Sequence, residues 1–164
     1  MVCQVRLCVL NVRLEMKEAA NLFFRDLHKN YFKRRGFKKT RNRFRRERDR
    51  VIELVDFQGS AFNSRGEPWN FYVNIGLGFV DLPLTTGVGL HREAYGIGRI
   101  EQLVEAAPSK FSYHESARDD LLETLPSLID SALEGLGSYE AEVYKRALNG
   151  HRSPIPIPNT WKSS

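Results

Sequence analysis

The stretch Trp69–Phe79, with the sequence WNFYVNIGLGF, decides the fold predicted for this chain. Alternate residues of a β-strand face the same side of a sheet. One side of this stretch is entirely apolar and consists of Phe71, Val73, Ile75, Leu77 and Phe79. The other side carries Tyr72, Asn74, Gly76 and Gly78. Because glycine has no Cβ, the two glycines predict either a close approach to the strand's backbone or a bulge.

Length and composition indicate one soluble globular domain. The chain has 164 residues, of which 41% are hydrophobic and 27% charged, as in ordinary globular proteins. No apolar run reaches the ~18 residues of a membrane helix, and Met1–Leu14, which has no small-residue cleavage site, does not read as a signal peptide. The two cysteines, Cys3 and Cys8, make neither a disulfide framework nor a zinc site. We expect a cytoplasmic protein without metal or cofactor.

Apolar residues at helical spacing predict helices before and after the strands. The first helix spans 15–35, and its apolar stripe is Ala20, Phe23, Phe24, Leu27 and Tyr31. The second begins at a capping-box pattern, Ser116–Asp119, and ends near Gly137. Pro126 is expected to kink it or to divide it into two abutting helices. A last short helix runs to about Leu148.

Three strands in a meander, and a fourth farther along, are predicted between these helices. The first helix ends at Gly36, a C-cap glycine. The predicted strands are 37–47, continuous or divided around 40–42, then 51–57, 69–80 and 111–114. Asp49-Arg50 is a tight turn, and 51–57 is apolar on both sides, as in an interior strand. Glycines and prolines predict loop for most of 81–98, with a short helix within 90–100.

These elements predict an α+β fold. An antiparallel sheet of three to four strands in a meander would be covered on one face by the N-terminal helix and the C-terminal helices. The other face would be exposed at least in part. Residues 1–14 form an N-terminal arm or short strand, 15–148 the single domain, and 149–164 a Pro-rich extended tail. Met16 is an alternative start of translation to Met1.

A series of short motifs resembles the bacterial family called domain of unknown function 4304. The motifs are Gly36–Lys39, Phe44–Arg46, Val55–Ser60 with Asn63, and Phe71–Gly76. The resemblance runs from about Met16 to about Leu148, and the N-terminal arm and the proline tail depart from the family. It implies a compact α+β domain with no established activity, and it supplies no catalytic residue.

Charge is unevenly distributed along the chain, whose net charge is +5. Lys33–Arg50 has eleven basic and two acidic residues, whereas Glu101–Glu142 has ten acidic and two basic ones. The candidate binding residues of the basic strand are Arg41, Arg43, Arg45 and Arg46. Arg41, Arg43 and Arg45 are expected on one side and Arg46 on the other. Such arginines could bind phosphates, protect a sheet edge from aggregation, or pair with the acidic segment of the same chain.

The loop after the second strand is the other candidate binding element. Its candidate residues are Gln58, Phe62, Asn63, Arg65 and Trp69. Amide, guanidinium and aromatic groups are typical of recognition loops. The alternative is structural: the amides would satisfy the loop's own backbone, and Trp69 would cover an edge of the core.

Nothing in the sequence forms a catalytic or metal-binding motif. The four histidines, His28, His91, His114 and His151, are scattered, without metal-ligand spacing. The leading hypothesis is therefore a non-enzymatic binding module that recognises another macromolecule, most plausibly a protein, in an immunity-like or regulatory role. The alternative is nucleic-acid binding through the basic strand 38–50. A third is a small enzyme with a site near His91 or His114.

Overall fold

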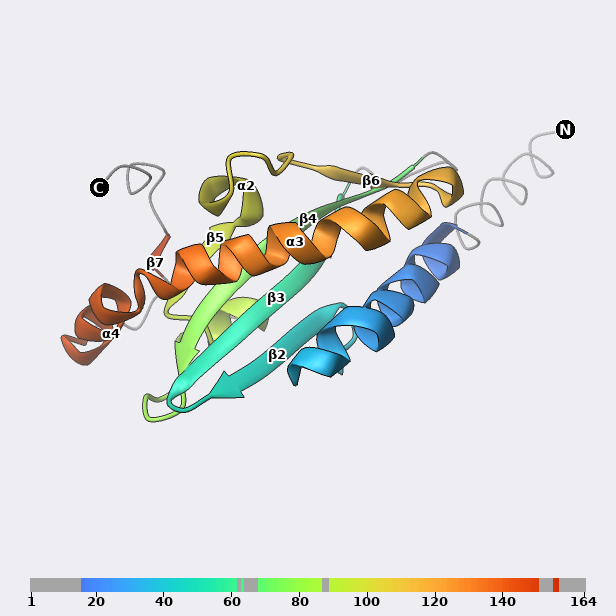
Figure 1. Ribbon diagram of the computed structural model, residues 1–164. Helices are drawn as coiled ribbons and strands as arrows, with labels where there is room; N and C mark the ends of the chain where they lie inside the picture. Colours follow the sequence, from blue (N-terminus) through green and yellow to red (C-terminus); the bar gives the residue numbers. More distant parts are fainter. Residues whose placement is uncertain (1–15, 62, 64–67, 87–88, 151–154, 157–164) are drawn as a thin grey trace, which may run out of the picture.

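The computed structural model describes residues 16–61, 63, 68–86, 89–150 and 155–156, and for residues 90 and 91 it describes the backbone alone. Within these residues, seven strands form one mostly antiparallel sheet with helices packed on one face (Figure 1). The α+β class is therefore confirmed, but the sheet has more strands than the three to four predicted. The expected arm 1–14 and most of the expected tail lie outside the described residues.

Four strands form the predicted meander. They are β1 (Lys38–Thr40), β2 (Arg43–Arg48), β3 (Val51–Gly59) and β4 (Trp69–Phe79), each antiparallel to the next. The first predicted strand is divided into β1 and β2 by a turn in which Arg41 has a φ of 57°. β3 is interior, and residues on both of its sides are buried. Both of these features agree with the sequence pattern.

The three remaining strands extend the sheet beyond β4. β6 (Phe111–Tyr113) was predicted, whereas β5 (Gly96–Arg99) lies where a loop was expected. Gly96 serves packing, since a Cβ at this position would lie 3.0 Å from Cγ2 of Val143. β7 (Ile155–Pro156) pairs in parallel with β5 at the sheet's edge, where a proline's missing N–H is tolerated.

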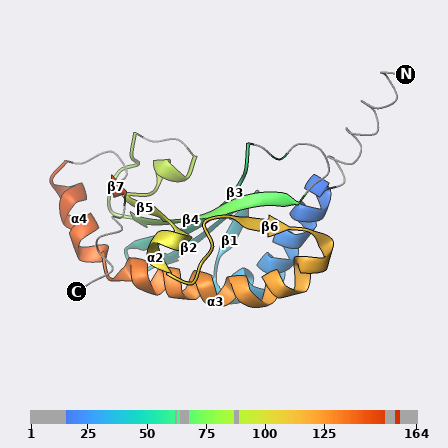
Figure 2. The ribbon, with the colours of Figure 1, turned by 90° about the horizontal axis from the view of Figure 1, so that it is seen from above.

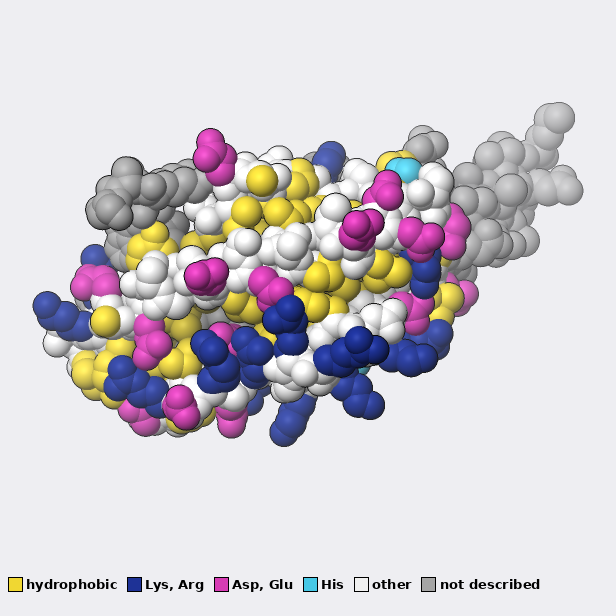
Figure 3. Space-filling view, viewed as in Figure 1, with side chains coloured by type: hydrophobic (Ala, Val, Ile, Leu, Met, Phe, Trp, Pro, Cys, Tyr) yellow, Lys and Arg dark blue, Asp and Glu magenta, His cyan; other side chains and the backbone are white. Residues whose placement is uncertain are grey.

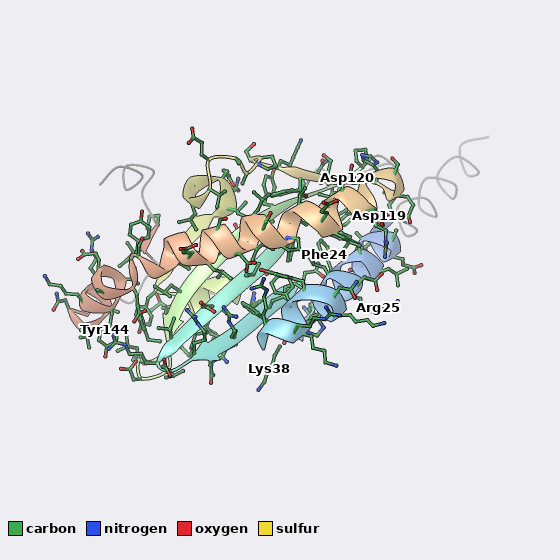
Figure 4. The ribbon with its side chains drawn as sticks, viewed as in Figure 1. Phe24, Arg25, Lys38, Asp119, Asp120 and Tyr144 are labelled. Atoms are coloured by element: carbon green, nitrogen blue, oxygen red, sulfur yellow. The ribbon has the colours of Figure 1, made fainter. Side chains whose placement is uncertain are left out.

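The helical layer begins with an α-helix over residues 16–27, which continues as a π-helical turn η1 (His28–Phe32) and a 3-10 turn η2 (Lys33–Arg35). The predicted apolar stripe of this helix is buried. Phe24, labelled in Figure 4, reaches the sheet, where its ring centroid lies 4.8 Å from that of Phe57. Gly36, with a φ of 81°, caps the end as predicted.

The 20-residue helix α3 (Arg118–Gly137) lies beside the N-terminal helix on the same face (Figure 1). The predicted capping box is wrong: Ser116 lies in a 3-10 turn, η4 (Glu115–Ala117), and its Oγ is 2.8 Å from Nδ1 of His114. The helix is continuous through Pro126, so two abutting helices do not form. The short helices α2 (Ile100–Leu103) and α4 (Glu140–Leu148) complete the described helical segments.

The opposite face of the sheet is partly covered by the chain itself. Figure 2 shows the described residues of segment 80–95, which are 80–86 and 89–95 and include the 3-10 turn η3 (Gly89–Arg92), on the side of the sheet opposite α3. A Cβ at Gly78 would lie 2.2 Å from the backbone oxygen of Glu93, and one at Gly76 would lie 3.2 Å from the Cβ of Ala94. The close approach predicted from the two glycines is therefore confirmed. Both glycines are buried, whereas Tyr72 and Asn74 on the same face are half-buried.

Candidate functional site

The rest of this opposite face is polar and only partly buried, and we call it the open face. It consists of Asp56, Gln58, Asn70, Tyr72, Asn74, Ile97 and Arg99. Strand register brings them together from β3, β4 and β5, since Gln58 pairs with Tyr72 and Asn74 with both Asp56 and Arg99. Their side chains share one side because they occupy alternate positions.

A depression of about 310 Å³ lies at the β5 end of the open face. Its lining consists of Gln58, Asn74, Ile97, Gly98, Arg99, Gln102 and Pro156. Of these described residues none has a carboxylate, an imidazole or a thiol. The described lining therefore carries none of the side-chain groups that most often act as a general base.

The polar side chains around the depression hold one another in place. Asn74 Nδ2 donates to Gln58 Oε1 at 3.1 Å, and the Arg99 backbone N–H donates to Gln102 Oε1 at 2.7 Å. The Arg99 guanidinium lies 4.4 Å from the centroid of the Tyr72 ring. Such stacking restrains a long side chain. The site is thus organised before any ligand binds.

The arginines of β2 are engaged in ion pairs within the molecule. Arg45 Nε lies 2.6 Å from Glu93 Oε2, and Arg43 Nε lies 3.6 Å from Asp56 Oδ1. Burial alone would lower the pKa of Arg45, but its hydrogen bonds to Glu93 and Glu47 raise that pKa above its ordinary value. Arg43 and Arg45 share the side of the open face, as the alternation predicts.

Two other residues of the basic strand differ in position. Arg41 was expected beside Arg43, but it lies in the turn between β1 and β2, because its positive φ takes it out of the strand. Arg46 lies on the helix-covered side, where its Nε is 2.5 Å from Glu53 Oε2 and its Nη1 donates to the Arg35 carbonyl at 3.0 Å. The positive charge of Arg46 therefore stabilises the C-terminal end of the N-terminal helix, where carbonyl groups carry partial negative charge.

A separate group of cations remains exposed or half-buried without an ion pair to any other described residue. We call it the basic edge, and it consists of Lys33, Arg34, Lys38, Lys39 and Arg41. β1 is the terminal strand of the sheet. Figure 3 shows basic side chains gathered along the lower margin, and Lys38, labelled in Figure 4, points outward there. Edge strands of this kind resist pairing with other sheets.

The loop after β3 uses its described polar residues for its own structure. Asn63 Nδ2 donates to the Asn70 carbonyl at 2.7 Å, and Asn63 Oδ1 accepts from the Asn70 N–H at 2.8 Å. Trp69 covers Gly59 on the helix side of the sheet, where a Cβ would lie 3.1 Å from its Cζ2. Of the loop candidates that the structure describes, Gln58 lines the depression. Phe62 and Arg65 lie outside the described residues.

The histidines do not converge on a site in the part of the chain that the structure describes. His28 Nε2 lies 3.3 Å from the Phe37 carbonyl, and exposed His114 bonds Ser116. The His91 side chain and His151 are outside the described residues. Within the described ranges, no group of three or more His, Cys, Asp or Glu residues could hold a metal ion. Nor is any described helix long and apolar enough to cross a membrane.

Sequence reasoning missed Arg99 and Gln102 as site residues. Both follow the segment that was read as loop because of Gly96 and Gly98. The available signal was alternation, since Ile97 and Arg99 occupy the same side of a short strand.

The molecule is thus an α+β domain with a helix-covered sheet face and a partly open polar one. Among known protein families, the one described as "Domain of unknown function (DUF4304)" matches residues 28–89 of the chain. The resemblance found in the sequence motifs is confirmed over that range. A search of curated proteins and a search of solved structures gave no match.

Proposed function

We propose that this protein is a non-enzymatic binding module that recognises another protein through the open face. The observation that carries the proposal is the pre-organised polar surface around Tyr72 and Arg99, on a sheet face that segment 80–95 covers only at one end. Aromatic residues and arginine dominate the energy of protein interfaces. An immunity-like or regulatory role in the cytoplasm suits such a module.

Photocrosslinking tests this proposal directly. A photoreactive phenylalanine analogue replaces Tyr72 on the open face, and in a matched control it replaces Glu134, which is exposed on α3. After irradiation in the native cell, the proposal predicts a discrete protein adduct at position 72 that is absent at position 134. Identical patterns at both positions, or adducts that a nuclease removes, would contradict it.

Nucleic-acid binding is the second candidate, and the basic edge is the observation that favours it. The arginines of β2 already neutralise acids of the same chain, so phosphates would have to be bound by Lys38, Lys39 and Arg41. Fluorescence anisotropy with labelled single-stranded, duplex and RNA oligonucleotides at ~50–200 mM salt tests this candidate. Nucleic-acid binding requires that the affinity for the oligonucleotide falls steeply as the salt concentration rises. In Arg41→Ala the affinity should depend less steeply on salt. Absence of binding at the lowest salt would eliminate it.

A further inference from the structure

Two hydrogen bonds within the depression each occupy the side-chain oxygen of a glutamine and leave its amide nitrogen free. A backbone N–H can only donate, so its bond from Arg99 fixes Gln102 with Oε1 occupied and Nε2 available. The Gln58 Oε1 is likewise occupied by Asn74 Nδ2, which leaves the Gln58 Nε2 available. The depression therefore presents the free amide N–H groups of Gln58 and Gln102, beside the side-chain oxygen of Asn74.

Arg99 adds the one formal charge among the described lining residues. Its guanidinium makes no ion pair with another described residue, and it is held against the Tyr72 ring. Five N–H donors in a planar fork match the geometry of a carboxylate. A single positive charge balances a monoanion, whereas a phosphate dianion would leave uncompensated charge.

We propose that this depression is a subsite for the carboxylate of an aspartate or glutamate side chain of the partner protein. The carboxylate would accept from Arg99 and from the free amide groups of Gln58 and Gln102. Ile97 and Pro156, which also line the depression, would contact the methylene groups of that side chain. The identity of the ligand as part of a protein rests on the proposed function, but the carboxylate preference of the depression does not.

NMR titration with propionate, an analogue of the glutamate side chain, tests this preference without the partner. We expect saturable shifts of the Arg99 Nε–H and of the Gln58 and Gln102 side-chain amides, at the ~10–100 mM typical of a few charge-assisted hydrogen bonds. Propionamide, which has the same shape without charge, should cause none of them. The spectrum of the free protein shows whether each variant is folded.

Matched variants distinguish a specific carboxylate site from the general attraction of an anion to any positive charge. Arg99→Gln should weaken propionate binding about tenfold, whereas Arg41→Gln, which removes the same charge at the basic edge, should leave it unchanged. Tyr72→Leu should weaken it about threefold through loss of stacking. Equal effects of Arg99→Gln and Arg41→Gln, shifts with propionamide, or tighter binding of inorganic phosphate would each overturn the proposal. A negative titration together with a crosslink at position 72 would overturn the subsite and keep the protein-binding function.

Discussion

Glu53 is the buried carboxylate on which we expect the hairpin of β2 and β3 to depend. Its side chain is 5% exposed on the helix-covered side of the sheet, between the guanidinium groups of Arg46 and Arg48. The Arg46 side chain is itself only 19% exposed. Glu53→Gln keeps the shape of the side chain and removes its charge, so Arg46 would retain a largely buried charge without its counter-ion.

The expected loss of stability follows from these contacts. Removing one member of a buried ion pair costs about 3–5 kcal/mol. Arg46 would keep its hydrogen bond to the Arg35 carbonyl and its position 4.5 Å from the centroid of the Phe37 ring, which lowers the expected cost to about 2–3 kcal/mol. With a urea m-value of about 2 kcal/mol/M, the midpoint should fall by about 1–1.5 M.

Urea unfolding followed by circular dichroism measures this effect, and the same hairpin provides a control. Glu47→Gln removes a carboxylate that is 52% exposed and pairs with Arg45, so it should cost at most about 1 kcal/mol. A double-mutant cycle of Glu53→Gln with Arg46→Gln should give a coupling energy of at least about 1 kcal/mol. If Glu53→Gln changed stability no more than Glu47→Gln, the pair would be effectively solvated and the reasoning would be refuted.

Two further predictions concern packing and alkaline pH. Gly78→Ala should destabilise the fold by about 3 kcal/mol in thermal unfolding, because its Cβ would overlap the backbone oxygen of Glu93. Gly137→Ala, with nothing within 4 Å of the new Cβ, should be neutral or stabilise by about 0.5 kcal/mol, and equal losses would contradict the argument. Burial and a hydrogen bond to Glu115 raise the pKa of Tyr113 from 10.0 to about 12. The neutral phenol therefore contributes stability that is complete below pH 10 and lost as the pH rises to about 12. Tyr113→Phe should show a smaller loss over that range when unfolding free energy is measured against pH, and parallel profiles would refute the assignment.

The candidate site was only partly predictable from the sequence. Gln58 was identified because an amide beside glycine and serine indicates a polar loop. Arg99 was not, because Gly96 and Gly98 make its strand look like a loop and because its neighbour Asn74 is far away in the chain. The bond between Gln102 and the Arg99 backbone is local, but its role in the site depends on β4 lying alongside.

The ion pairing of the basic strand also could not be predicted from the sequence. Its composition indicates a positive segment but says nothing about pairing. Register places Arg46 opposite Glu53 and Arg43 opposite Asp56, and the fold of segment 80–95 brings Glu93 to Arg45. The sequence left open whether these arginines bind phosphates, protect an edge or pair within the chain. In the structure the arginines of β2 are paired within the chain, and the unpaired charges of this segment lie at the basic edge.

The elements with a periodic signal could be predicted from the amino-acid sequence. The apolar alternation of Trp69–Phe79, the helical stripes and Gly36 fixed the strand, the helices and the end of the first helix, because each reflects local backbone geometry. Three features depend on the folded molecule as a whole: β5 and β7 extend the sheet, Glu93 and Ala94 fill the space over the two glycines, and Arg99 stacks on Tyr72. These contacts join segments distant in the chain, and their energies come from burial and pairing that no local pattern encodes.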